Sequence, residues 1–171
     1  MPRVRRRGES GAATTDKGRE HPEATMNDRV DRASILTLFE GIQSAFPNLH
    51  MHVQGEHPHV DLMLDIPRQP GLVFPVNLNL QGDELHLSAG PFWLEWFPCT
   101  DSEVVARYRQ AVVGLLSGEY RILEHLVGKR TVKAQLQRPD GEKWETIGTS
   151  FGIGGVLPWR RSTRVLQNLG S

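Results

Sequence analysis

The sequence predicts an α+β fold: a two-layer sandwich in which one antiparallel sheet of about six to eight strands carries two helices on one face. Two segments place apolar residues at the spacing of an amphipathic helix. Several shorter runs alternate apolar and polar residues, as strands covered on one side do. Short turns separate these runs, which favours antiparallel pairing over a doubly wound sheet. The expected order is α-β-β-β-β-(β)-α-β-β-β.

The first helix is expected over residues 28–46. Asn27 or Asp28 can cap its N-terminus, where acidic residues also suit the helix dipole. Pro47 and Asn48 end it. Its apolar stripe consists of Ile35, Leu38, Phe39, Ile42 and Phe46.

Strand-like runs follow the first helix at residues 50–54, 60–66, 74–81 and 85–89. Each run has one apolar face, which is typical of a sheet covered on one side. Gly82 and Asp83 separate the last two runs and indicate a hairpin turn. The next run, residues 92–97, is apolar on both faces apart from Glu95, which predicts a central or doubly covered strand.

The second helix begins after residue 100, where Thr100 and Glu103 fit a capping box. Gly118 is the expected residue just beyond its C-terminus. Its apolar face consists of Val104, Val105, Tyr108, Ala111, Val112, Leu115 and Leu116. Three further strands are expected over residues 120–127, 130–137 and 144–149, with turns at Gly128 and Gly141 between them.

This order of elements resembles that of type III secretion chaperones and related bacterial folds, which follow α-β-β-β-α-β-β-α. The resemblance covers residues 28–150 and consists of element order alone, since no sequence motif carries it. The chain departs from the pattern by an additional strand and by the lack of a final helix. The resemblance implies a related α+β fold, and a shared fold does not determine a shared function.

The chain divides into three segments by composition. Residues 1–25 contain no aromatic residue and few apolar ones, so we expect a disordered N-terminal extension, with Met26 as an alternative start. Residues 26–157 are expected to form a single α+β domain. Residues 158–171 carry three arginines and no acidic residue, and are expected to form a basic C-terminal tail.

Composition excludes several classes of protein. The 171 residues have no net charge, and the central domain carries eleven Lys/Arg against sixteen Asp/Glu, which argues against a nucleic-acid partner. No apolar run approaches the roughly 18 residues of a membrane span. A single cysteine excludes a disulfide scaffold. We therefore expect a cytoplasmic bacterial protein with no membrane span.

Four of the seven histidines lie within ten residues, at positions His50, His52, His57 and His59. Residues two apart on a strand share a face, so His50 and His52 can point at one ion while the other two return across a hairpin. Imidazole ligands suit zinc or a similar divalent metal. The alternative is a solvated strand edge that Pro58 protects from pairing.

Three other features admit a functional and a structural interpretation. Cys99 directly precedes the second helix and is either a reactive thiol or a small buried hydrophobe. Glu95, between Trp93 and Trp96, is either a buried functional carboxylate or an ion-pair partner or exposed acid on a strand edge. A polar strand face can line a ligand groove or face water; it consists of Asn77, Asn79 and Gln81.

Aromatic residues late in the chain predict a partner surface, consisting of Trp93, Trp96, Trp144, Phe151 and Trp159. No catalytic constellation or cofactor motif accompanies them. The favoured interpretation is a non-enzymatic protein-binding, adaptor or chaperone-like module whose partner is another protein or a second copy of itself. The alternatives are a metal-binding protein or metal-dependent enzyme built on the histidine cluster, and a small-ligand pocket between helices and sheet.

Overall fold

A computed structural model of the chain describes residues 26–55, 58–152 and 161–169, with side chains from residue 32 onward. The expected extension over residues 1–25 therefore lies outside the described residues. The elements are α1 Met26–Ala45, β1 His52–Gln54, β2 Leu62–Ile66, β3 Val76–Gln81, β4 Glu84–Ala89, β5 Phe92–Trp96, α2 Ser102–Leu116, β6 Arg121–Val127, β7 Arg130–Asp140, β8 Lys143–Phe151 and β9 Arg161–Leu166.

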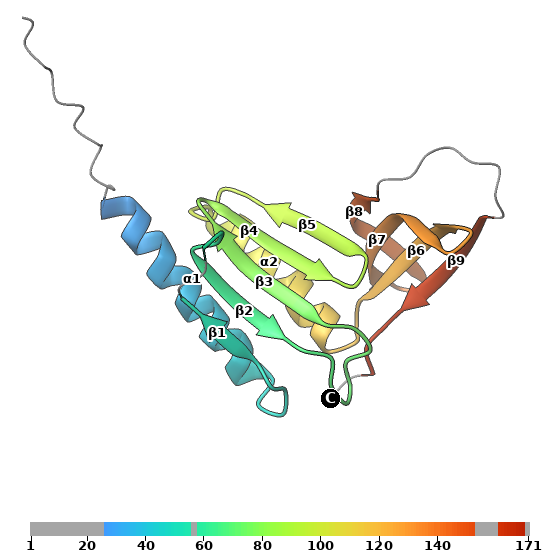
Figure 1. Ribbon diagram of the computed structural model, residues 1–171, viewed down its shortest axis with the longest axis horizontal. Helices are drawn as coiled ribbons and strands as arrows, with labels where there is room; N and C mark the ends of the chain where they lie inside the picture. The colour runs from blue at the N-terminus through green and yellow to red at the C-terminus, as the bar shows by residue number, and fades with distance from the viewer. Residues whose placement is uncertain (1–25, 56–57, 153–160, 170–171) are drawn as a thin grey trace, which may run out of the picture.

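The strands form two antiparallel sheets, a five-stranded sheet in the order β1-β2-β3-β4-β5 and a four-stranded sheet in the order β8-β7-β6-β9 (Figure 1). The α+β class, the antiparallel pairing and the two helices on one face are confirmed, whereas the single sheet of six to eight strands is wrong in its count and continuity. The sheets meet through side chains, because Leu94 of β5 lies against Gly148 of β8. In a single continuous sheet, backbone hydrogen bonds between strands would join these two parts; here the side-chain contact takes their place.

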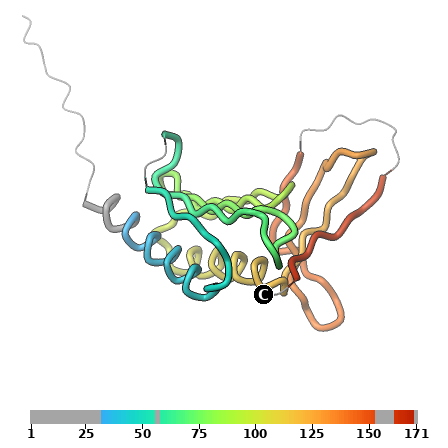
Figure 2. The backbone as a smooth tube through the Cα atoms, turned by 60° about the horizontal axis from the view of Figure 1, so that its bottom comes forward, coloured from blue at the N-terminus to red at the C-terminus, as the bar shows by residue number. Residues whose placement is uncertain are grey.

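A layer of apolar side chains joins the five-stranded sheet to both helices, which lie below it in Figure 2. Alternate strand residues such as Leu64, Leu78 and Leu87 are completely buried against this layer. From the helices, Phe39 and Tyr108 are also completely buried. The alternation read from the sequence therefore identifies the core face of this sheet. Among the described helices, none has the length and apolarity needed to cross a membrane.

The start of α2 differs in its cap from the expected capping box. Asp101 is the N-cap residue, and its carboxylate accepts a hydrogen bond from the Glu103 backbone N–H at 2.8 Å. An aspartate caps a helix as well as a serine or threonine does, so the helix begins one residue later than Thr100 predicts. Gly118 follows the C-terminus with a φ of 77°, as expected.

β5 is the last strand of its sheet, not a central or doubly covered strand. Its burial alternates: Phe92 is buried and Leu94 is half-buried, whereas Trp93 and Glu95 are exposed. The large apolar side chains at both sets of positions concealed this period of two.

The segment expected as a basic tail contributes a strand and an anchor. β9 pairs with β6 over six residues, Ile122 opposite Leu166 through Val127 opposite Arg161. Beyond it, Asn168 is buried, accepts a hydrogen bond from the Val73 backbone N–H at 3.0 Å and donates one to the Leu115 carbonyl at 2.9 Å. The chain after β9 therefore connects the end of α2 to the loop between β2 and β3.

Candidate functional site

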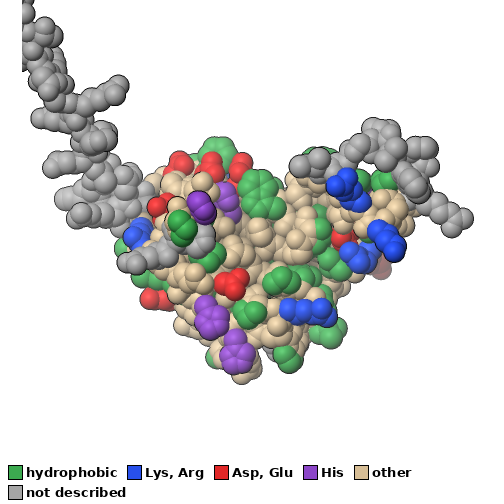
Figure 3. Space-filling view, in the orientation of Figure 1, with side chains coloured by type: hydrophobic (Ala, Val, Ile, Leu, Met, Phe, Trp, Pro, Cys, Tyr) green, Lys and Arg blue, Asp and Glu red, His purple; other side chains and the backbone are tan. Residues whose placement is uncertain are grey.

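The face of the five-stranded sheet that points away from the helices is polar. Strand alternation and register assign to it His52, Gln54, Met63, Asp65, Asn77, Asn79, Gln81, Glu84, His86, Ser88, Trp93 and Glu95. Acidic and histidine side chains gather near its upper edge in Figure 3. The polar row at Asn77, Asn79 and Gln81 lies within this face, next to β4. We call it the outer face.

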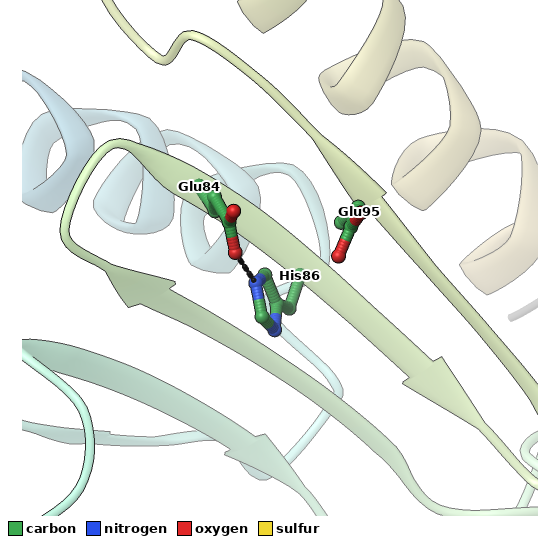
Figure 4. A group of neighbouring side chains, drawn as sticks. All are labelled: Glu84, His86 and Glu95. Atoms are coloured by element: carbon green, nitrogen blue, oxygen red, sulfur yellow. Dashed lines mark hydrogen bonds and ion pairs between the residues drawn. The ribbon is translucent and has the colours of Figure 1, made fainter.

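Glu84, His86 and Glu95 form a group on the outer face (Figure 4). Glu84 and His86 are two residues apart on β4 and therefore share a face. Glu95 of β5 is the register partner of His86. The two-residue turn between Ala89 and Phe92 sets this register and so brings the second carboxylate to the imidazole.

The three side chains lie close enough to share one ion. One ligand atom from each, the imidazole nitrogen and two carboxylate oxygens, lies within 4.8 Å of the other two. The Glu84 Oε2 and His86 Nε2 atoms are 3.0 Å apart. His86 is only 9% exposed, whereas the Glu84 side chain is 40% exposed and Glu95 is exposed as well. The group thus combines a buried histidine with two carboxylates that are partly or fully accessible to water.

Two aromatic residues fix the position of His86. On the outer face, the Trp93 ring meets the imidazole edge-on, with centroids 5.5 Å apart and an interplanar angle of 86°. From the helix side, the Tyr108 hydroxyl donates a hydrogen bond to the His86 carbonyl at 3.0 Å. Burial raises the pKa of Tyr108 well above its usual value, so this hydroxyl remains a donor across the physiological range.

Asn79 of β3 lies directly opposite His86 in the sheet register. Its side-chain nitrogen donates to the Asn77 side-chain oxygen at 3.1 Å. Its own side-chain oxygen is buried and has no hydrogen-bond partner in the part of the chain that the structure describes. An unsatisfied acceptor of this kind costs stability and needs an explanation, which a bound ligand or a donor from a reoriented imidazole would supply.

The sequence-predicted metal site lies elsewhere. His52 is on the outer face opposite Asp65, and His50, His52 and His59 are all exposed. His57 lies outside the described residues. Among the residues that are described, only Glu84, His86 and Glu95 form a group of three with metal-ligand spacing, so the histidine-cluster hypothesis gains no geometric support and stays a prediction.

The predicted aromatic surface is divided among different environments. Trp96 packs edge-on against Tyr108 with centroids 5.3 Å apart, and Trp144 lies under the Arg121 guanidinium at 3.9 Å. Trp93 is 46% exposed on the outer face, and Phe151 is exposed at the end of β8. Trp159 lies outside the described residues. The four side chains that the structure describes do not share one face of a sheet.

Two of the other candidates have clear environments. Cys99 is buried in the main apolar cluster, as a small hydrophobe would be. Glu95 is exposed on an edge strand, which is the structural alternative, so the interpretation as a buried carboxylate is wrong. The signal that could have identified its position beside His86 is the spacing of Glu84, His86 and Glu95 about the two-residue turn.

Comparisons with known proteins give no assignment: no family model matches the chain, and no curated protein or solved structure is significantly similar to it.

Proposed function

We propose that the protein binds a divalent transition-metal ion, with zinc as the first candidate, through Glu84, His86 and Glu95. The observation that carries this proposal is the mutual approach of their three ligand atoms to within 4.8 Å. The sequence also suggested a metal site, but at the β1–β2 hairpin; the site proposed here is at the β4–β5 hairpin.

The ligand types fit zinc. One imidazole and two carboxylates are common zinc ligands, and three protein ligands leave a position of a tetrahedral ion open for water or a substrate. Bonds of about 2.0–2.2 Å hold the ligand atoms of a tetrahedral ion about 3.3–3.6 Å apart. Because Glu84 and Glu95 are at least partly exposed, rotation of these two side chains can close the group around an ion while His86 stays in place.

The surroundings of His86 support the same proposal. A metal-bound histidine usually donates its second ring N–H to a fixed acceptor, which sets the tautomer. The unsatisfied side-chain oxygen of Asn79, opposite His86, is an acceptor of the right kind at the right register position. An Asn79→Ala substitution is therefore expected to weaken zinc binding about tenfold without removing a ligand.

The test is zinc titration of the chelator-treated protein by calorimetry, with native mass spectrometry for stoichiometry. We expect one zinc ion per chain, and binding at least about tenfold weaker in His86→Ala and in Glu95→Gln. His52→Ala, on the same face but outside the group, is the matched control and should bind as the unmodified protein does. Absence of stoichiometric zinc, or loss of zinc in His52→Ala with retention in His86→Ala, overturns the proposal.

A cytoplasmic location remains part of the proposal, since a single buried cysteine suits a reducing compartment. A protein-binding role is the second candidate, and a cleft between β5 and β8 that is lined by Trp96 and Phe97 favours it.

A further inference from the structure

A cleft separates the two sheets beside α2. Its volume is about 560 Å³, within the range of about 300–1,000 Å³ typical of ligand sites. β5 forms one wall and β8 the other, and α2 forms the floor; we call it the β5–β8 cleft. Its apolar lining includes Trp96, Ile147 and Phe97, the last of which is 61% exposed. An exposed phenylalanine in a concave site is a contact surface for an apolar group.

The wall formed by β5 is a strand edge with which no other strand pairs among the described residues; Ser150 occupies it at Trp93, and it is open at Glu95. β5 pairs with β4 on one side only, and the Trp93 backbone N–H points away from β4, because it donates to the Ser150 hydroxyl at 3.3 Å. Backbone groups alternate in direction along an antiparallel strand. Glu95, two residues on and also lining the cleft, therefore presents its N–H and C=O to the cleft. Such an edge is a template for an added strand.

The floor of the cleft carries an available positive charge. Arg138 is engaged by Glu145 at 2.7 Å. Arg107 of α2 lines the same cleft and is exposed, and no acidic side chain pairs with it in the described ranges. The Glu95 carboxylate belongs to the group with His86 on the outer face, so it does not neutralise Arg107. An occupant with an acidic side chain directed at α2 would complement this charge.

We propose that the β5–β8 cleft binds an extended peptide segment of a partner protein, which adds to β5 as a strand and places an acidic side chain against Arg107. Side chains alternate between the two faces of the added strand. One set therefore faces α2, where Arg107 selects Asp or Glu, and an adjacent apolar residue contacts Phe97. The proposal does not depend on metal binding, since it uses the backbone of Glu95 and not its carboxylate.

The experiment selects from a library of short acetylated peptides with valine or threonine at alternate positions and every residue type at the others. We expect selected peptides to carry Asp or Glu at one fixed position and to bind at least about tenfold more weakly when that residue is replaced by its amide. Arg107→Gln should cause a similar loss. Arg109→Gln is the matched control, because Arg109 is an exposed arginine of the same helix that does not line the cleft.

The strand geometry has its own test. Methylation of peptide nitrogens should abolish binding at alternate positions only, since every second N–H faces β5. Glu84→Gln removes a proposed metal ligand that does not line the cleft, so it should weaken zinc binding and retain the peptide. Three results overturn the peptide proposal: no enrichment of any peptide, equal binding of acidic and amide peptides, and competition by free glutamate, which would identify a small carboxylate ligand. A concentration-dependent dimer that Arg107→Gln dissociates would instead identify a second copy as the occupant.

Discussion

The two sheets of this protein are stabilised in different ways. The five-stranded sheet lies on two helices, and its inner face is an almost continuous layer of buried leucine, valine, isoleucine and phenylalanine. Neither of the two described helices belongs to the four-stranded sheet alone, and the buried positions of this sheet include Glu124 and Gln137 beside Ile122, Ala134 and Leu136. The first sheet depends on hydrophobic burial, which pH does not change. The second sheet depends more on the backbone hydrogen bonds between its strands and on charged side chains.

Glu124 is the centre of that difference. Its side chain is fully buried and accepts hydrogen bonds from Arg164 of β9 and, at 2.7 Å, from the Thr131 hydroxyl. Burial raises the pKa of Glu124. The hydrogen bonds from Arg164 and Thr131 and the charge of Arg164 lower it by more, so the pKa of this carboxyl lies below its usual value. The carboxylate is thus ionised in the folded protein at neutral pH.

The largest effect is expected from a cavity in the helix layer. Phe39→Ala removes a completely buried ring from α1 and should lower the free energy of unfolding by about 3–5 kcal/mol. Urea unfolding followed by circular dichroism measures this. Leu36→Ala, at an exposed position of the same helix, is the control and should cost less than about 1 kcal/mol. Equal effects of the two substitutions would contradict a hydrophobic basis for this sheet.

The contact between the sheets offers a second test. A Cβ atom at Gly148 would lie 2.6 Å from Leu94 Cδ2, so Gly148→Ala requires the Leu94 side chain to shift and should cost about 1–3 kcal/mol. Because the obstructing atom is the tip of a side chain, Leu94→Ala should relieve much of the strain. A double-mutant cycle in urea measures this coupling. Strictly additive costs would show that the sheets do not pack through this pair.

The next loss of stability is expected at Asn168, which anchors the chain after β9. Asn168→Ala leaves the Val73 N–H and the Leu115 carbonyl without their partner, at a cost of about 1–3 kcal/mol. The neighbouring Gln167 makes an exposed hydrogen bond to the Gly118 carbonyl at 2.7 Å, and Gln167→Ala should cost less. Hydrogen exchange at the end of α2 reports the local effect. If the two variants lose equal stability, the burial of Asn168 contributes nothing to the free energy of unfolding.

Arg164→Ala leaves the fully buried Glu124 carboxylate without its cationic partner, although the Arg164 side chain is mostly exposed and water can partly replace it. Its signature is its dependence on pH. A carboxyl whose folded pKa is lowered contributes stability above its unfolded pKa and loses it as the pH falls through the folded pKa. The difference in urea midpoint between the unmodified protein and Arg164→Ala should therefore shrink on acidification. A difference that stays constant or grows at low pH would contradict an ionised Glu124.

The same contrast explains what the sequence could predict. Runs such as residues 62–66 and 76–81 bury every second side chain against the helices, so their alternation revealed strand, face and core together. β9 buries none of its first five residues, and nothing in its pattern marks it as a strand. The pairing of Arg164 with Glu124 is a contact over 40 positions, which local periodicity does not register.

The candidate site shows a similar limit. Glu84, His86 and Glu95 were each visible as single residues, and the turn after Ala89 determines which of them face one another. The histidine cluster was prominent because its members are close in sequence. In the structure His50 is part of a loop, where its backbone N–H donates to the Gln69 side chain at 2.7 Å, so it does not continue the strand that contains His52. The register of the hairpin determines which of these side chains lie together, and closeness in the sequence does not.

The pairing of β9 with β6 has a consequence for synthesis on the ribosome. β6 is translated before β9, and a nascent chain that already contains β6, β7 and β8 still lacks the strand that covers the other edge of β6. During that interval Glu124 has no Arg164, and the backbone groups of β6 are open to pairing with another chain. The five-stranded sheet and both helices are complete by then. The four-stranded sheet is therefore the part of this protein for which a chaperone acting on nascent chains would matter most.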